Sequence, residues 1–297
     1  MISVLIPVRD GGADLVRCLE AVARQRGDAE VEVVVVDSGS SDGSAARARR
    51  LGVRVHEISP EEFDHGATRN LAGELARGEV LVFTTQDAYA ERDDWLQTLV
   101  APLDDPDVAG VYGRQVAHED ARPPERFFLD FLYGPEPRSQ RASGLDELSL
   151  ETTLFSNVNS AMRREVWERN RFAEGIVMSE DQEWSRRMLL AGRSIVYEPR
   201  AVVRHSHAYT LGSAFCRFFA SGMSAEDSYL SGSSSRGALR RAALSYAGRE
   251  IAWLWRTGQR RWLPYTAVYE LTKLAALQLG SRHRKLPPRL TRRLRGA

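Results

Sequence analysis

The amino-acid sequence predicts an α/β protein with a doubly wound parallel sheet, and two observations support this class. Short runs of apolar and β-branched residues alternate with segments whose apolar residues recur at helical spacing. This alternation is typical of sheets that helices cover on both faces. In addition, polar and acidic residues directly follow several of the runs, and such sheets bind ligands at the carboxyl ends of their strands.

The first elements form a strand–helix–strand unit. Residues 3–7 are a short apolar run that predicts a strand ending at Pro7, because proline lacks a backbone donor. Residues 14–26 show helical spacing, and residues 31–36 form a second apolar run. This run leads into an acidic, Gly- and Ser-rich segment at residues 37–44. We therefore expect a βαβ unit with a polar loop at its mouth.

The alternation continues to the strand around which the sheet is organised. Residues 47–51 end a short helix, and residues 53–58 form a third strand. A further helix follows residues 63–70. Residues 80–87 then predict a buried strand that ends in the single carboxylate of Asp87.

After this strand, apolar spacing from residue 95 to residue 99 predicts another helix, and residues 108–112 predict another strand, which leads into Arg114. Residues 117–150 are rich in proline and aromatic residues. We interpret them as an irregular excursion that shapes a pocket or lid.

Two helices and two strands are expected beyond the excursion. Residues 163–169 form the first helix, and residues 179–190 form the second, with Ser179 as N-cap and acidic residues in the first turn. Residues 194–197 and 201–203 predict two short strands, the second of which leads to a pair of histidines.

Composition limits the compartment and the relation to membranes. The two cysteines, Cys18 and Cys216, show no metal or redox spacing, which favours a reducing compartment. The first residues lack a basic signal region, and no run approaches the roughly 20 apolar residues of a membrane span. We therefore expect a cytoplasmic protein.

Charge is segregated along the chain. Residues 236–297 contain 15 Lys and Arg against two acids, a local charge of +13, and the net charge of +1 leaves −12 for residues 1–235. In this tail three tryptophans alternate with arginines: Trp253, Trp255 and Trp262 with Arg249, Arg256, Arg260 and Arg261. This pattern favours peripheral contact with the inner face of the plasma membrane. The alternatives are packing against the rest of the protein or a homodimer contact. No recognition motif accompanies the charge, so nucleic acid is not an expected partner.

Four residues at the ends of predicted elements could carry chemistry, namely Asp37, Asp87, Asp181 and His205. Each also has an ordinary structural reading. An aspartate commonly opens a turn, and an acid at a helix N-terminus interacts with the helix dipole. Position along the chain alone therefore does not assign a function to any of them.

Five segments together resemble the inverting glycosyltransferases of family 2, which have the GT-A fold, a doubly wound α/β fold with a mixed, mostly parallel sheet that binds nucleotide sugars. Residues 3–8 resemble the opening strand of the family, and residues 33–44 resemble its acidic nucleotide loop. Residues 80–87 resemble the strand that carries its DxD motif, residues 179–181 its catalytic-base motif, and residues 203–205 the strand that delivers a metal-binding histidine.

The resemblance divides the chain into two expected parts. Residues 1–210 would form the GT-A domain, and residues 211–297 a helical, basic C-terminal extension. More specifically, four segments look like the bacterial rhamnosyltransferase branch of the family: residues 63–70, 84–88, 113–115 and 205–210. One departure is that this chain has Thr85, Gln86 and Asp87 where relatives have DxD. The last Asp of that motif is normally the direct metal ligand.

The resemblance also implies roles for single residues. Asp181 would be the general base, and Asp87 and His205, with His207 as a less favoured third ligand, would hold Mg²⁺ or Mn²⁺. The residues expected to bind the nucleotide sugar are Pro7, Arg9, Asp37, Ser38, Arg69, Asn70, Gln86, Asp87 and Arg114.

The implied reaction is transfer, with inversion, of a sugar to a hydroxyl of a cell-surface glycan precursor. L-Rhamnose from dTDP-rhamnose is the favoured donor, and a lipid-linked glycan or polysaccharide is the expected acceptor. The alternatives are a glycosyltransferase that uses another UDP- or GDP-sugar, and a nucleotide-sugar-binding module without activity.

Overall fold

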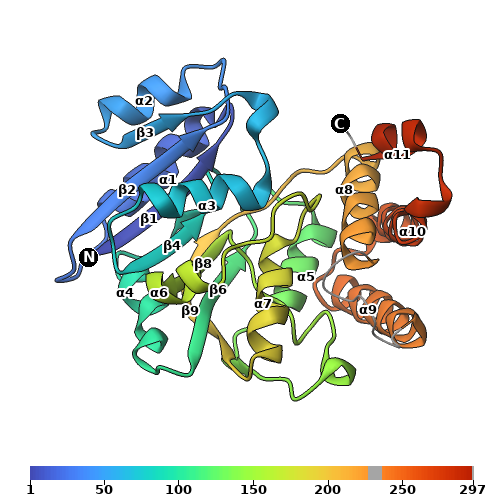
Figure 1. The fold of residues 1–297 in the computed structure, drawn as a ribbon. Helices are drawn as coiled ribbons and strands as arrows, with labels where there is room; N and C mark the ends of the chain where they lie inside the picture. The colour runs from blue at the N-terminus through green and yellow to red at the C-terminus, as the bar shows by residue number, and fades with distance from the viewer. Residues whose placement is uncertain (227–235, 296–297) are drawn as a thin grey trace.

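In the computed structural model, residues 1–226 and 236–295 are described, with the side chains of residues 236–244 left out. The nine strands of this described part form one mixed sheet in the order β3-β2-β1-β4-β8-β6-β9-β5, and β7 pairs with β9 outside this order (Figure 1). The strands are β1 (Ile2–Val8), β2 (Val31–Asp37), β3 (Arg54–Glu57), β4 (Val80–Thr84), β5 (Tyr89–Ala90), β6 (Val108–Val116), β7 (Arg138–Gln140), β8 (Asn159–Arg163) and β9 (Ser194–Arg204).

Strand directions change within this sheet. Strands β1, β2, β3 and β4 run parallel to one another. Strand β8 is antiparallel to both of its neighbours, β4 and β6, whereas β6 and β9 are parallel. Because β8 reverses the direction once on each side, β4, β6 and β9 all end at the same edge of the sheet. The predicted α/β class with a mixed sheet is confirmed.

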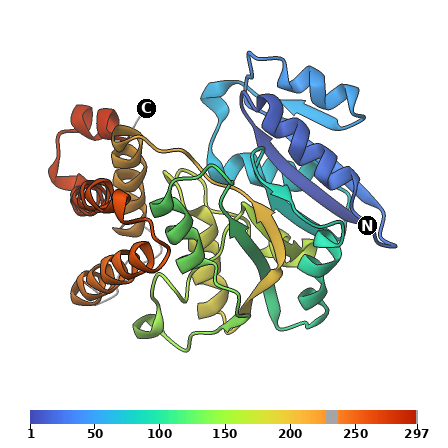
Figure 2. The same cartoon turned by 180° about the vertical axis from the view of Figure 1, so that it is seen from behind.

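Helices cover both faces of the sheet. Helices α3, α6 and α7 lie in front of it in Figure 1, and α1 lies in front of it in Figure 2. The strands bury alternate residues in the two resulting cores. In β1, Val4 and Ile6 face the core that contains α1, whereas Leu5 faces the core that contains α3 and α7. This two-sided burial explains the unbroken apolar runs at the centres of β2 and β4.

The helices, including those beyond the sheet, follow in chain order. They are α1 (Gly12–Ala23), α2 (Ser44–Arg50), α3 (His65–Leu75), α4 (Trp95–Val100), α5 (Pro123–Leu132), α6 (Arg164–Arg169), α7 (Glu180–Leu190), α8 (Leu211–Ser224), α9 (Arg236–Arg256), α10 (Leu263–Gly280) and α11 (Pro288–Leu294). Short 3₁₀ turns lie at 60–62, 101–104, 145–147, 260–262 and 283–285.

Two expectations about elements are wrong. Residues 117–150 are not irregular throughout, because they contain α5 and β7. The proline pair Pro123–Pro124 stands in the first turn of α5, where the missing backbone donors have no helical partner to lose. The two short strands predicted at 194–197 and 201–203 are one strand, β9, with an irregularity in its register opposite Gly113 and Arg114. That irregularity interrupts the alternation that a regular strand would show.

The helices α8 to α11 form a group beside the sheet, next to α5 and α7 (Figures 1 and 2). Helices α8 and α10 approach closely at Gly280, where an added Cβ would lie 2.1 Å from the carbonyl oxygen of Phe219. The group has a small core of its own around Phe219, Met223 and Ala276. Helix α8 begins at the predicted start of the extension, but the extent of the two parts stays a prediction, since residues 227–235 and 296–297 lie outside the described residues.

A buried lysine joins this helical group to α5. Lys273 is only 5% exposed, so its ammonium is largely shielded from water. The ammonium pairs with Glu270 at 2.7 Å. It lies about 5 Å from the centres of rings from three other helices, Phe128, Phe218 and Tyr246. Cation–π contacts of this kind are worth more when desolvated. Among the described residues, no helix is both long enough and apolar enough to cross a bilayer.

Candidate functional site

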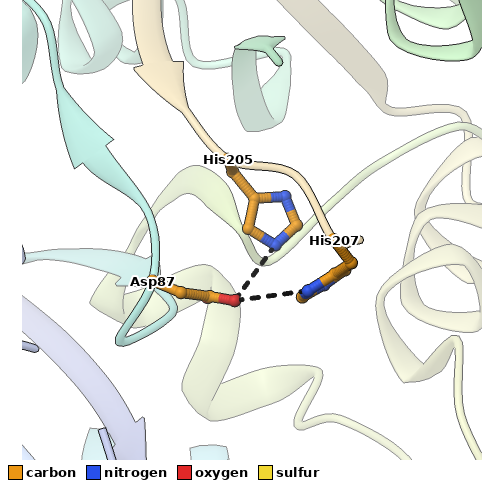
Figure 3. A group of neighbouring side chains, drawn as sticks. All are labelled: Asp87, His205 and His207. Carbon is orange, nitrogen blue, oxygen red and sulfur yellow. Dashed lines mark ion pairs between the residues drawn. The ribbon is translucent and has the colours of Figure 1, made fainter. Parts of the chain in front are cut away.

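One carboxylate and two imidazoles converge at the edge of the sheet. The carboxylate oxygen of Asp87 lies 3.7 Å from Nε2 of His205 and 3.6 Å from Nδ1 of His207. One ligand atom from each of the three residues lies within 4.8 Å of the others. Figure 3 shows the Asp87 carboxylate pointing toward both rings. We call these three residues the Asp–His trio.

The sheet topology explains why these residues meet. Strands β4 and β9 run in the same direction, so the segments that follow them lie at one edge. Asp87 lies three residues beyond the end of β4, in a turn, and not at the strand end as predicted. Strand β5 then pairs with β9 so that Tyr89 stands opposite Arg204. This antiparallel pairing places Asp87 beside the residues that follow β9, which include His205 and His207.

The electrostatics of the trio suit metal ligation. Burial opposes ionisation of Asp87, but the two histidines hold its pKa below the ordinary value. Burial lowers the pKa of His205 to about 4, against the opposing effect of Asp87, and it also lowers the pKa of His207. At neutral pH the trio therefore presents one carboxylate and two neutral imidazoles, the forms that coordinate metals.

The spacing also accommodates a cation. Two ligand atoms that each lie about 2.1 Å from one divalent ion are separated by at most about 4.2 Å. The two measured separations from Asp87, 3.7 and 3.6 Å, fall below this limit. Asp87 can therefore share a divalent cation with either histidine as the side chains lie, and the 4.8 Å span of all three ligand atoms closes to this limit by small side-chain rotations.

Gln115, which follows the predicted strand at 108–112, orients His205. Its side-chain oxygen lies 3.0 Å from Nδ1 of His205, while its amide nitrogen donates to the hydroxyls of Tyr133 and Ser156. Because the oxygen can only accept, His205 must carry its proton on Nδ1. Nε2 is then left with a lone pair that faces Asp87. The sequence interpretation included Gln115 in a family-like segment but gave it no role.

We expect Gln115→Leu to lower the affinity for Mn²⁺ by about 10–100-fold, the usual loss when the partner of a ligating histidine is removed. Isothermal titration of the protein with Mn²⁺ measures this change. Gln115→Glu keeps an acceptor for Nδ1–H and should retain more affinity than Gln115→Leu. Gln97→Leu, at an exposed position of α4, is the control, and equal affinities of the two leucine variants would contradict the positioning role.

A second acidic group lies at the start of α7. The carboxylate of Asp181 accepts hydrogen bonds from the backbone nitrogens of Asn157 and Gln182, at 3.0 and 2.8 Å. Burial and the neighbouring carboxylate of Glu180 raise the pKa of Asp181 to about 7. Burial also opposes ionisation of Glu180, but its contact with Arg69 at 3.0 Å keeps its pKa below the ordinary value. The two carboxyl groups therefore titrate differently: Glu180 is ionised, whereas Asp181 gains and loses its proton near neutral pH.

Ser179 was predicted to be the N-cap of α7, and its position is confirmed. Ser179 occupies the N-cap position, but its side chain makes no capping bond, and its backbone adopts a left-handed conformation with φ of 65°. Such a conformation is strained for a residue other than glycine. The left-handed conformation of Ser179 changes the direction of the backbone immediately before Glu180 and Asp181.

The predicted nucleotide loop contains a buried carboxylate with an unused acceptor. Asp37 is 1% exposed, and its Oδ1 accepts from the backbone nitrogens of Gly39 and Ser40. Its other oxygen, Oδ2, is buried without a hydrogen-bond partner among the described residues. A buried carboxylate oxygen costs free energy unless a donor reaches it. An external donor group is the simplest partner for this atom.

The neighbouring loops are tied to each other through two predicted site residues. The side-chain amide of Gln86 accepts from the backbone nitrogen of Arg9 and donates to its carbonyl, at 2.8 and 3.0 Å. Ser38 donates to the carbonyl of Val8, the last residue of β1. Pro7 lies within β1, half-buried. These contacts hold the ends of β1, β2 and β4 together at one edge of the sheet.

The structure changes the interpretation of Asn70 and Arg69 and gives Arg114 a neighbour on α5. Asn70 is buried, and bonds to Phe172, Trp167 and Glu174 occupy both its amide hydrogens and its oxygen. Its contact with the donor therefore stays a prediction, one for which the structure leaves no free polar atom of the side chain. Arg69 pairs with Glu180 in the interior, so we now expect it to hold Glu180 in place and not to contact the donor directly. Arg114 lies 3.7 Å from Asp130 of α5.

A cleft of about 850 Å³ opens beside the Asp–His trio. Its walls include Asp87 and His207, together with Arg17 of α1, His118 and Tyr209. Asp181 is not among the lining residues of this cleft. The Asp–His trio and Asp181 are instead connected through Gln115. Its side chain bonds His205 on one side and Ser156 on the other, and Ser156 is next to Asn157, which bonds Asp181.

The fold and this edge define a class of protein. A mannosyltransferase from Pyrobaculum calidifontis, in complex with GDP-Man and Mn²⁺, aligns with a TM-score of 0.62 and 22% sequence identity, covering 94% of this chain and 86% of that one. TarS from S. aureus, residues 1–349 in complex with UDP-GlcNAc, aligns with a TM-score of 0.53 and 17% identity over 96% and 91% of the two chains. The chain therefore has the GT-A glycosyltransferase fold.

The chain belongs to glycosyl transferase family 2, whose family model matches residues 3–170, and it is a glycosyltransferase. The O-antigen chain rhamnosyltransferase RfbN of Salmonella typhimurium is 34% identical over 225 residues, 75% of this chain and 71% of that protein. The O-antigen chain rhamnosyltransferase WbaN of Salmonella anatum is 36% identical over 194 residues, and the matched region is 62% of its length. The predicted family is confirmed.

Proposed function

We propose that this glycosyltransferase transfers L-rhamnose from dTDP-rhamnose to a hydroxyl of a cell-surface glycan precursor. The observation that carries the proposal is that one edge of the sheet holds both the Asp–His trio and a carboxylate whose pKa is about 7. The sugar and the glycan rest on the two relatives, both of which are named O-antigen chain rhamnosyltransferases. Solved neighbours in complex with GDP-Man and UDP-GlcNAc support a nucleotide-sugar donor.

In the proposed reaction Asp181 is the general base. The acceptor oxygen forms a bond to the anomeric carbon while the bond from that carbon to the diphosphate oxygen breaks. Asp181 takes the proton of the acceptor hydroxyl, and the leaving diphosphate takes the electron pair of the broken bond. A base with a pKa near the working pH is the most effective one, and proton transfer of this kind contributes about 10²–10⁴ in rate. A single displacement inverts the anomeric configuration.

Asp87, His205 and His207 are the residues that would hold the divalent cation. When bound, this cation would neutralise charge on the departing diphosphate as a Lewis acid. Two imidazole ligands favour Mn²⁺ over Mg²⁺, because Mg²⁺ prefers oxygen ligands. We propose that Asp37 accepts a hydrogen bond from the base or ribose of the nucleotide through Oδ2, and that Arg9 and Arg114 approach its phosphates or sugar.

A thermal-shift comparison in the presence of Mn²⁺ tests the donor. We expect dTDP to raise the melting temperature more than UDP or GDP does at equal concentration, because only a ligand that binds the folded state stabilises it. Release of dTDP from dTDP-rhamnose on addition of a glycan acceptor is the accompanying activity assay. A larger shift with UDP or GDP would favour the alternative donors. Binding of dTDP-rhamnose without any turnover would favour the inactive binding module.

We also propose that α9 and α10 place the enzyme on the inner face of the plasma membrane. Of the three tryptophans in the predicted interface, only Trp255 is exposed. Other large apolar side chains are also exposed on these two helices, namely Ile251 at 48%, Val268 at 49% and Leu271 at 67%. Exposed arginines accompany them, namely Arg260 and Arg261. Apolar and cationic side chains together suit an anionic lipid surface.

Co-sedimentation with anionic phospholipid vesicles at low salt tests this contact. We expect the full chain to pellet with the vesicles. The Leu271→Asp variant should remain largely in the supernatant, because membrane contact would bury the new carboxylate in the lipid interface. Leu51→Asp, at a position 50% exposed after α2, is the matched control and should pellet. If both variants pellet like the wild type, α10 is not the membrane surface. A dimer in solution would instead favour the homodimer alternative.

A further inference from the structure

A second cleft lies between α5 and α9, outside the trio and the nucleotide loop. Its volume is about 290 Å³, and its walls are Phe127, Asp130 and Phe131 of α5 with Arg249, Trp253 and Arg256 of α9. Both views show these two helices side by side (Figures 1 and 2). Helix α9 lies beyond residues 3–170, the part that the family model matches.

The walls combine aromatic faces with polar groups that remain available. The ring of Trp253 packs 5.8 Å from that of Phe127, and the Arg249 guanidinium lies 5.4 Å above the Phe131 ring. Phe131 is 38% exposed despite its size. Within the described part of the chain, neither Arg249 nor Arg256 forms an ion pair. The cleft thus offers stacking surfaces and two unneutralised guanidinium groups.

From this combination we infer that the cleft between α5 and α9 binds a pyranose ring of the acceptor glycan, at a distance from the transfer centre. A pyranose has an apolar face of C–H groups, which packs on the negative face of an aromatic ring. Its rim of hydroxyls is satisfied by guanidinium donors and by a carboxylate acceptor such as Asp130. The volume lies near the lower end for small-molecule sites, about 300–1,000 Å³, which suits one ring and not a long segment.

The wall also argues against a simple anion site. Asp130 would repel a phosphate, whereas a neutral hydroxyl can donate to it. Asp130 also lies 3.7 Å from Arg114, and α5 contacts the trio at its other end, where Glu125 accepts from the backbone nitrogen of His207. One helix therefore forms a wall of this cleft and contacts the edge of the sheet. A glycan that occupies the cleft would be held beside the enzyme while its end reaches the transfer centre.

This inference rests on the proposed function only in its choice of a glycan acceptor. Binding is measured on the full chain by saturation-transfer difference NMR, with methyl α-L-rhamnopyranoside and a rhamnose-containing oligosaccharide as probes. We expect signals from the ring protons of the sugar in the wild type and a loss of at least about fivefold in Trp253→Ala. Trp255→Ala, which removes an exposed tryptophan of the same helix, is the matched control and should leave the signals unchanged.

Because Trp253 is half-buried and contacts Phe127, its removal could disturb folding. Arg256→Gln avoids this problem, since Arg256 is exposed, and Arg50→Gln, at an exposed position of α2, is its control. We expect Arg256→Gln to raise the KM for the glycan acceptor by about tenfold, the loss of one good polar contact, with the KM for the donor unchanged.

Unchanged sugar signals and acceptor KM in Trp253→Ala and Arg256→Gln would overturn the inference. A second result would also overturn it: loss of the sugar signals when inorganic pyrophosphate is added to the wild type without Mn²⁺. The cleft would then be an anion site. The two hypotheses can fail independently. If dTDP-rhamnose is not a donor but sugar binding still depends on Trp253, the proposed function fails and the inference about the cleft stands.

Discussion

Replacing Asp181 by asparagine is expected to reduce the turnover number for transfer by about 10²–10⁴-fold, because the variant can no longer accept the proton of the acceptor hydroxyl. The donor should bind with near-normal affinity, since this proton transfer occurs only in the transition state. Initial rates of dTDP release at saturating acceptor measure the loss. Residual turnover above about a tenth of the wild-type value would contradict a base role.

The same residue predicts the pH dependence. Asp181 is active as a base only when ionised, and its pKa is about 7. We therefore expect wild-type turnover to rise through about pH 7 and level off above it, and this step to be absent from the residual activity of Asp181→Asn. Glu183→Gln is a suitable control, because it removes another acid from the first turn of α7.

Stability should change in the opposite direction from activity. A carboxyl group whose pKa is raised in the folded state contributes stability below its unfolded pKa, and this contribution is lost as the pH rises through the folded pKa, here about 7. Above pH 7 the ionised, buried Asp181 therefore costs stability, and Asp181→Asn is expected to melt at the wild-type temperature or higher. A clearly lower melting temperature at pH 8 would mean that the loss of activity reflects folding.

Asp87→Asn is expected to lower transfer by at least about 10²-fold at a fixed, moderate Mn²⁺ concentration, because the trio loses its only negative charge. Part of the activity should return at high Mn²⁺, since the two imidazoles remain. Addition of EDTA to the wild type should reproduce the loss, and added Mn²⁺ should restore activity more fully than Mg²⁺ does.

The control for Asp87 is Asp94→Asn, which changes an aspartate that pairs with Arg92 at the surface. This variant should keep the wild-type response to Mn²⁺. If Asp87→Asn binds Mn²⁺ as tightly as the wild type in a direct titration, the cation is not held by the trio. The cofactor of the proposed reaction would then need another site.

Part of the site could be predicted from local sequence, because chain order and strand character are local properties. Apolar runs of the right length predicted strands at β1, β2 and β4, and the polar residues after them predicted a ligand edge. The family-like segments indicated Asp87, Asp181 and His205 as the residues to examine. Their roles remain predictions, but the structure brings Asp87 and His205 within 3.7 Å of each other.

Other properties of the site depend on neighbours from distant parts of the chain. Nothing local to β8 indicates that it runs antiparallel between β4 and β6, and nothing in Gln115 indicates that His205 would be its partner. Asn70 had the sequence context of a binding residue, yet its partners, Phe172 among them, come from another segment and occupy it fully. A pattern of apolar and polar residues shows that a side chain is buried, but not which groups it meets.

The sequence by itself therefore determined the class of fold and the edge of the sheet at which the polar residues gather, because these follow from the spacing of residue types along the chain, and the resemblance of five segments indicated the family. Only the tertiary structure decided that β5 pairs with β9 and carries Asp87 to the histidines, that Glu180 and burial raise the pKa of Asp181 to about 7, and that α5 and α9 enclose an aromatic cleft. The reason is that distances and desolvation are set by packing between segments that are far apart in the sequence.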